Sequence, residues 1–379
     1  MENPFIYGKV VKGKYFADRE KEIEVLTNEL SRGQNVILFS PRRYGKTSLI
    51  LNVLDGLREK GFLTIYIDLY PATTREKLIR IYAKAVSTVL TGRLEKILSE
   101  LRELFTRIIP KISIGAGGGP EIEYEIKVEH KNLEEAFEEA LQAPQKIASR
   151  RKKRVIVALD EFQEIGNLQD EDEIEKKIRT NIQHHDMVSY AFLGSKRHLM
   201  EKIFHDKNRP LYRIGSHIPL GKISFESFKR FIENHFQSGG FELEEGVIQE
   251  IIRISDGHPY YTQMLCSILW EMNLDKRKIS LADVEKALLE ALAREEHAYT
   301  TLWDSLTIKQ KRFIEGLCTE KSIRPFSWEF IERYRLGSPA TVQRVLQRLS
   351  EDGVIEKENG TYSLADVFFR EWVIRKIRR

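Results

Sequence analysis

The first half of the chain alternates short apolar runs with longer stretches in which apolar residues recur at helical spacing. Each apolar run is compact, as expected for a strand that is buried on both faces. Strands are predicted at residues 36–39, 63–69, 155–159 and 190–194, and helices between them at residues 46–58, 75–90 and 133–150. Because strands that alternate with helices form βαβ units, the pattern predicts an α/β core built on a parallel sheet.

A segment at residues 94–130 breaks this alternation. A helical stretch at 94–109 is followed by apolar residues of period two on both sides of a glycine-rich stretch at 115–120, which predicts a hairpin or a loosely ordered flap. None of these glycines precedes the Lys-Ser/Thr pair that opens a helix in phosphate-binding loops. We therefore interpret the segment as a surface insertion.

The second half of the chain is predicted to be mostly helical. From Ser224 onward, amphipathic helices are expected at residues 225–236, 245–254, 260–270 and 281–298. Helices at 306–318, 328–334 and 339–350 then precede two short strands at 353–357 and 360–364, which is the order of a winged helix-turn-helix. The expected domains are a core at residues 1–222 that includes the insertion, an all-helical lid at 223–300 and a winged helix-turn-helix at 301–379.

The predicted strand 36–39 leads into a loop and then a helix. The loop and the start of the helix are Ser40, Pro41, Arg42, Arg43, Tyr44, Gly45, Lys46, Thr47 and Ser48. This is the phosphate-binding motif GxxxxGK[ST], except that Ser40 replaces the first glycine. Loop amides would surround the β-phosphate, Lys46 would bridge the β- and γ-phosphates, and the Thr47 hydroxyl would ligate Mg²⁺. Gly45 would let the backbone approach the phosphates, because a Cβ there would collide with them.

The predicted strand 155–159 leads into Asp160 and Glu161. Both carboxylates would therefore lie at the carboxyl edge of the sheet, where open α/β sheets bind their ligands. Asp160 would hold Mg²⁺ through its water shell, and Glu161 would orient or deprotonate an attacking water. Together with the Lys46 loop, this pair predicts metal-assisted phosphoryl transfer.

Three further residues are candidates for contact with the γ-phosphate. Ser195 follows the predicted strand 190–194 and would lie between the other two strand ends, where it could sense this phosphate or simply cap a helix. Downstream, Arg209 and Arg213 each offer a guanidinium to stabilise the transition state, within one subunit or from a neighbour. The sequence leaves open which arginine acts, and with it the oligomeric state.

These motifs follow one another as they do in a known family. The chain resembles the archaeal ATPase family, a branch of the STAND/AAA+ P-loop proteins akin to the origin-recognition ATPases. The matching stretches are residues 15–22, 40–47, 66–68, 159–163, 192–195, 210–213, 257–261 and 366–372. The resemblance implies a P-loop NTPase fold that binds ATP or ADP with Mg²⁺ and hydrolyses ATP to ADP and phosphate.

The resemblance also implies nucleotide contacts outside the phosphate-binding loop. Phe16 and Arg19 belong to an N-terminal box that lies near the adenine in the family. His258 and Pro259 belong to the family's lid motif, in which this turn packs against the nucleotide. From the residues alone, Pro259 suits the first turn of a helix, and His258 could be merely its cap.

The charge of the chain leaves the partner of the winged helix open. A net charge of +4 is too small to attract nucleic acid in general, so such a partner must meet a local patch. On the predicted helix 339–350, Thr341, Arg344 and Arg348 could read base edges or hold phosphates of double-stranded DNA. Residues 301–379 carry 15 Lys/Arg against 11 Asp/Glu, which is only modestly basic. A protein partner or an internal brake is therefore an equal alternative.

The remaining composition favours a cytoplasmic protein. Cys266 and Cys318 lie far apart and in no metal-ligand spacing, so both are expected to be buried thiols in a reducing compartment. The N-terminus lacks the apolar run of a signal peptide, and no stretch approaches the ~18 apolar residues that span a bilayer.

Taken together, the residues predict an ATPase that serves as a switch. Mg²⁺-dependent ATP binding and hydrolysis would change how the winged helix is held. The alternative is a nucleotide-loaded scaffold for protein interactions, with negligible turnover. The intact set of Lys46, Thr47, Asp160 and Glu161 favours the ATPase.

Overall fold

A computed structural model describes residues 2–17, 19–114, 120–126, 130–320, 323–358 and 360–377. The glycine-rich stretch of the predicted insertion falls mostly on residues 115–119, outside the described residues. The chain divides into two compact units, which are described separately. One unit is Arg19–Gly221, and the other combines Met1–Asp18 with Lys222–Arg379.

The first unit is built on a five-stranded sheet with the order β2-β5-β6-β1-β7, in which every neighbouring pair is parallel. Its strands are β1 (Val36–Phe39), β2 (Leu63–Asp68), β5 (Val155–Asp160), β6 (Val188–Gly194) and β7 (Ser216–Pro219). The predicted parallel α/β core is therefore confirmed. All four predicted strands are present, and β7 is an additional edge strand.

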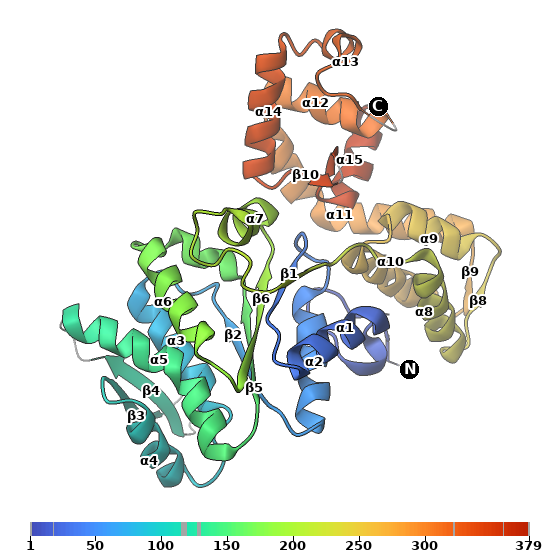
Figure 1. The fold of residues 1–379 in the computed structure, drawn as a ribbon. Coiled ribbons are helices and arrows are strands. Elements are labelled where there is room, and N and C mark those ends of the chain that lie inside the picture. The colour runs from blue at the N-terminus through green and yellow to red at the C-terminus, as the bar shows by residue number, and fades with distance from the viewer. Residues whose placement is uncertain are drawn as a thin grey trace. The chain divides into compact units, whose positions relative to one another are not determined.

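Helices cover both faces of this sheet. They are α1 (Glu20–Ser31), α2 (Lys46–Glu59), α3 (Arg75–Ser87), α5 (His130–Arg151), α6 (Glu171–Gln183) and α7 (Arg197–His205). Figure 1 shows α1 and α2 on one side of the sheet and α3, α5 and α6 on the other. A parallel sheet covered on both faces leaves only its strand ends open, and this is where a ligand can bind.

The insertion contains the helix α4 (Leu94–Leu104) and an antiparallel hairpin of β3 (Ile108–Ile114) and β4 (Pro120–Ile126). The helix that we predicted at 94–109 was therefore too long. Strand β3 begins at Ile108 because Ile108 and Pro110 alternate with more exposed neighbours and face Ile126 and Tyr124 across the hairpin. The hairpin packs against α3 and leaves the sheet of the core complete.

The second unit begins with a helical subdomain. Its helices are α8 (Phe225–Ser238), α9 (Val247–Ser255), α10 (Pro259–Met272) and α11 (Leu281–Ser305). Two short strands, β8 (Glu242–Leu243) and β9 (Lys278–Ile279), also form here, where we expected an all-helical lid. The N-terminal segment, with the 3₁₀ turn η1 (Gly13–Tyr15), joins this subdomain through the buried ring of Phe5, 4.7 Å from Phe236.

The chain ends in a winged helix. Its elements are α12 (Ile308–Thr319), α13 (Trp328–Arg333), α14 (Pro339–Glu351), β10 (Ile355–Glu358), β11 (Thr361–Leu364) and α15 (Val367–Ile377). Helix α11 extends through Ser305, so the expected boundary at residue 300 falls inside a helix. Helix α15 packs against α9, α11 and α12, and the helical subdomain and the winged helix share one hydrophobic core. Within the described part of the chain, no helix has the length and hydropathy to cross a membrane.

Candidate functional site

A buried lysine at the end of the loop between β1 and α2 binds carbonyl groups of that loop. Lys46 is the first residue of α2 and is only 5% exposed. Its Nζ donates hydrogen bonds to the carbonyl oxygens of Ser40 (2.7 Å) and Pro41 (2.9 Å). The ammonium group therefore lies within the loop next to the amino end of α2, where the helix dipole also attracts anions.

The backbone of this loop explains which of its positions require glycine. Gly45 has a φ of +82°, a left-handed conformation that glycine adopts without strain. A Cβ on Gly45 would meet no protein atom within 4 Å, so the space beside it is open to a ligand. Ser40 is not among the residues with positive φ, so this position does not need glycine. Both features fit a phosphate cradle.

The remaining residues of the loop differ in exposure. Arg42 and Arg43 are exposed, whereas Tyr44 and Ser48 are buried. Arg43 has a φ of +68°, which turns the chain sharply in the middle of the loop. Their contribution to nucleotide binding stays a prediction.

Asp160 and Thr47 meet at the carboxyl edge of the sheet. The Thr47 hydroxyl donates to Asp160 Oδ2 over 2.6 Å, although the two residues are 113 positions apart. The Tyr66 hydroxyl donates to the same oxygen over 2.9 Å. Burial raises the pKa of Tyr66, and the nearby Asp160 carboxylate raises it further, so the phenol stays a neutral donor. The oxygen pair of Thr47 and Asp160 suits a hard divalent cation such as Mg²⁺.

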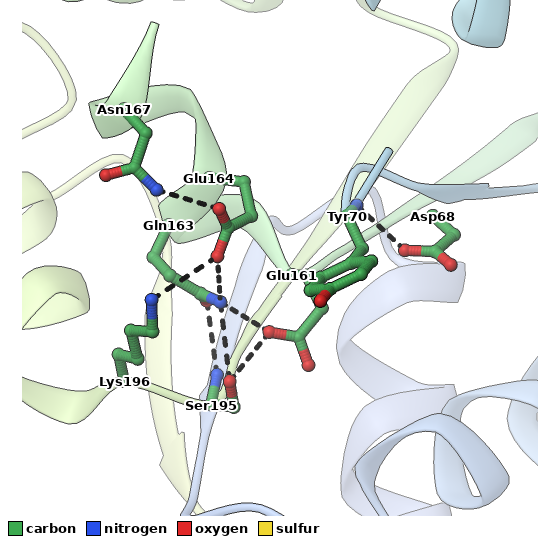
Figure 2. Close-up of polar contacts among 8 residues, drawn as sticks. All are labelled: Asp68, Tyr70, Glu161, Gln163, Glu164, Asn167, Ser195 and Lys196. Carbon is green, nitrogen blue, oxygen red and sulfur yellow. Dashed lines mark hydrogen bonds and ion pairs between the residues drawn. The ribbon is translucent and has the colours of Figure 1, made fainter. Parts of the chain in front are cut away.

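Glu161 and Ser195 meet at the same edge (Figure 2). The Ser195 hydroxyl donates to Glu161 Oε2 over 2.7 Å. Strand β6 lies between β5 and β1, so Ser195 follows a strand that is flanked by the strands of the other two motifs. Glu161 has a φ of +51°, and the chain turns there from β5 into the 3₁₀ helix η2 (Phe162–Asn167). The structure thus brings together the residues that we predicted at the ends of β1, β5 and β6.

The two candidate arginines lie in different environments. Arg209 is 10% exposed and binds Glu171 (2.9 Å), Asp172 (3.0 Å) and the fully buried Glu175. Arg213 is exposed, and its guanidinium lies 5.1 Å from the ring centroid of Tyr212. Arg209 therefore serves a buried ion-pair network, which leaves Arg213 as the accessible guanidinium.

Arg213 is far from the phosphate-binding loop of its own chain. It comes shortly before Ser216, whose amide donates to the carbonyl of Asn35 at the amino end of β1 (2.9 Å). Strand β1 runs from Asn35 to the loop at Ser40. At the rise per residue of a β-strand, these two residues are about 16 Å apart. Arg213 thus lies at the opposite edge of the sheet from the loop.

Substitution of Arg209 tests this division of roles. Arg209→Ala should lower the free energy of unfolding by roughly 3–5 kcal/mol, because it leaves the buried carboxylate of Glu175 without its partner. Arg213→Ala removes an exposed side chain and should change the free energy of unfolding by less than about 0.5 kcal/mol. Chemical denaturation of both variants measures the difference. Equal stability of the two variants would show that the Arg209 network is dispensable.

The other predicted nucleotide contacts lie outside the loop. Phe16, His258 and Pro259 belong to the second unit, in which Pro259 begins α10 and His258, 2% exposed, precedes it. Arg19 is 5% exposed, and its guanidinium donates to Glu22 (2.7 Å) and to the carbonyl of Gly221 (2.6 Å). The contacts of these four residues with a nucleotide stay predictions.

In the winged helix, the predicted DNA-contacting residues lie on α14. Arg344 and Arg348 are exposed, and Arg348 pairs with Asp352 over 3.0 Å. Thr341 is half-buried in the first turn, where its amide donates to the capping hydroxyl of Ser338. The two arginines share the solvent-facing side of α14.

Sequence reasoning missed two residues at the edge of the sheet. Tyr66 reaches Asp160 because it lies on β2 opposite the small Ala158, two residues before Asp160 on the neighbouring strand. Gln163 is fully buried and contacts both Glu161 and Ser195. Both residues fall in stretches that match the family, 66–68 and 159–163, but nothing in the sequence assigned either of them a role.

Comparisons with known proteins identify related sequences and folds. Residues 16–265 match the model of an ATPase domain predominantly from Archaea, and residues 297–375 match that of a winged helix domain. No curated protein matches the chain.

The solved structures that share the fold include the following three. The Walker-type ATPase of Pyrococcus abyssi is 19% identical, with a TM-score of 0.67 over 98% of this chain and 99% of that one. The ORC2 protein of Aeropyrum pernix, solved with ADPNP and ADP, is 14% identical, with a TM-score of 0.55 over 100% and 98%. The ORC1 protein of the same organism, solved in complex with DNA, is 16% identical, with a TM-score of 0.51 over 95% and 93%.

Proposed function

Because the chain belongs to the family of ATPase domains found predominantly in Archaea, we propose that it binds ATP with Mg²⁺ at the carboxyl edge of its sheet and hydrolyses it. One observation carries this proposal. The ends of three strands bring a lysine loop, an Asp–Thr oxygen pair and a Glu–Ser pair to the same edge, through contacts of 2.6 Å (Thr47–Asp160) and 2.7 Å (Ser195–Glu161). Nucleotide hydrolysis uses each of these groups.

Each group has its own task in this proposal. Lys46 exchanges its bonds to loop carbonyls for bonds to the β- and γ-phosphates, while the amides of the loop bind the same oxygens. Thr47 and Asp160 would hold Mg²⁺, which would neutralise charge on the phosphates. Glu161 accepts the proton of the attacking water. Ser195 senses the γ-phosphate.

Arg213 fits a role in a neighbouring subunit. It is exposed and lies at the other edge of the sheet from its own loop, so its guanidinium can reach only a nucleotide that another copy binds. We therefore propose that turnover involves an oligomer in which Arg213 stabilises charge on the neighbour's phosphates. Turnover per chain that stays constant with protein concentration would count against this role.

The second unit supports a switch. Helix α15 of the winged helix packs against α9 and α11, and the Tyr299 hydroxyl donates to Asp366 over 3.1 Å. Because the helical subdomain and the winged helix share one core, a change in that subdomain displaces the winged helix with it. ATP and ADP would favour different arrangements, and equal affinity of the ATP- and ADP-loaded forms for the partner of the winged helix would contradict the coupling.

Duplex DNA is the first partner to test. The fold is shared with an ORC1 protein solved in complex with DNA, and Arg344 and Arg348 are exposed together on α14. Replacing both arginines with alanine should weaken DNA binding about tenfold or more. The slope of log affinity against log salt concentration should also become shallower by the equivalent of about two phosphate contacts. Fluorescence anisotropy at several salt concentrations measures both effects.

The matched control is Arg32→Ala with Arg58→Ala, which removes the same charge from exposed positions of the core. If both double variants bind DNA as the wild type does, the recognition-helix assignment fails, and a protein partner becomes the better candidate for the winged helix.

Steady-state release of phosphate from Mg²⁺-ATP tests the enzymatic part of the proposal. Turnover supports it. Tight ATP binding without release contradicts it and favours the nucleotide-loaded scaffold.

A further inference from the structure

Gln163 connects two groups of the proposed active site. It lies in η2, two residues after Glu161, and its side chain is fully buried. Its Nε2 donates to Glu161 Oε2 and, over 3.3 Å, to Ser195 Oγ, while its Oε1 accepts from the amide of Ser195 over 3.2 Å. Figure 2 shows the amide group between the two residues. One side chain thus contacts the ends of both β5 and β6.

The orientation of this amide group is determined by its neighbours. The backbone N–H of Ser195 can only donate, so it selects the oxygen of the amide. The NH₂ group must then face Glu161, whose ionised carboxylate can only accept. A flipped amide would place two donors against each other at Ser195 and two acceptors at Glu161. The direction of the Glu161 carboxylate therefore follows from a backbone N–H on the neighbouring strand.

The protein leaves space for this contact at the end of β6. A Cβ on Gly194 would lie 2.7 Å from Gln163 Oε1 and 2.3 Å from the sulfur of Met200. Both neighbours are buried and cannot move away freely. The absence of a side chain at residue 194 is thus what allows Gln163 to reach Ser195.

From this geometry we propose that Gln163 is a positioning residue, which holds the Glu161 carboxylate beside Ser195 and thereby aims it at the water that attacks the γ-phosphate. This inference rests on the proposed ATP hydrolysis. Gln163 itself does not belong to the phosphate-binding loop, so its loss should misdirect the base without weakening the binding of ATP.

Two variants separate positioning from packing. Gln163→Met keeps the length of the side chain but has no amide donor, so kcat should fall roughly 10- to 100-fold while KM and ATP affinity stay within about twofold. Gln163→Glu has nearly the same shape. Its carboxyl group can still donate to Glu161 while the two carboxyl groups share one proton, but when both are ionised they repel each other.

The pH profile of kcat is the decisive measurement. The ratio of kcat in Gln163→Glu to that in the wild type should fall as the pH rises and the shared proton is lost, whereas the ratio for Gln163→Met should stay low at every pH. If Gln163 only packs, Gln163→Met, which fills similar space, should keep a normal kcat at every pH, and this result would overturn the inference.

Two controls distinguish this inference from the hydrolysis on which it rests. Asn167→Ala changes an exposed side chain of the same 3₁₀ helix and should leave kcat unchanged. The wild type in the same assay must turn over. Its failure would overturn the proposed function and this inference together, while a wild-type turnover that Gln163→Met does not reduce would overturn this inference alone.

Discussion

Lys46→Ala should strongly weaken the binding of ATP. Lys46 is the buried cation of the loop, and its Nζ is surrounded by carbonyl oxygens that cannot themselves bind phosphate. Its loss removes charge-assisted hydrogen bonds to two phosphates, which corresponds to a decrease in affinity of about 10- to 100-fold. Titration with a fluorescent ATP analogue, together with steady-state phosphate release, measures the binding and the turnover that depends on it.

Lys60→Ala is the matched control for this variant. It makes the same substitution at the other end of α2, at an exposed position. Lys60→Ala should bind and hydrolyse ATP as the wild type does, whereas Lys46→Ala should not. If Lys46→Ala also binds ATP normally, the loop is not the phosphate site.

Glu161→Gln should separate ATP binding from hydrolysis. The substitution keeps the shape of the side chain but removes its ability to accept a proton, so turnover should fall by about 10²- to 10⁴-fold. Lys46, Thr47 and Asp160 are unchanged, and ATP affinity should therefore stay close to that of the wild type. Single-turnover phosphate release and an ATP titration on the same preparation measure the two effects.

Glu164→Gln provides the matched control, because it removes the same charge three residues along the chain. Glu164 binds Asn167 (2.7 Å), Lys196 (3.6 Å) and, over a longer distance, Gln163 Nε2 (3.5 Å), but it does not contact Ser195. Turnover should survive in this variant. Normal turnover in Glu161→Gln would remove Glu161 from the mechanism.

The sequence predicted most of the core, because its strands are buried on both faces and appear as continuous apolar runs. Strand β7 could not be predicted in this way. It lies at the edge of the sheet, only two of its residues are half-buried, and it ends in Pro219. The N-terminal segment was also beyond pattern analysis, since Phe5 packs against residues more than 200 positions away.

In the candidate site, too, the sequence could identify residues within a motif but not contacts made through the tertiary fold. Lys46, Thr47, Asp160 and Glu161 belong to motifs that are contiguous in sequence, so spacing alone could identify them. Tyr66 reaches Asp160 only through the register between β2 and β5. Gln163 reaches Ser195 only because η2 folds back over the end of β6.

The choice between the two arginines needed the tertiary structure as well. Both lie in one short segment of the sequence, and both are charged. Two features of the fold distinguish them. The acidic residues of α6 surround Arg209, whereas the start of β7 places Arg213 at the amino edge of the sheet.

The most direct test of the central claim is multiple-turnover phosphate release by the wild-type chain with ATP and Mg²⁺, compared with the same reaction in excess EDTA, each with and without duplex DNA. An ATPase that uses the Thr47–Asp160 pair for its metal should release many phosphates per chain with Mg²⁺ and almost none with EDTA. ATP that stays bound without phosphate release, in Mg²⁺ and in the presence of DNA alike, would contradict the account.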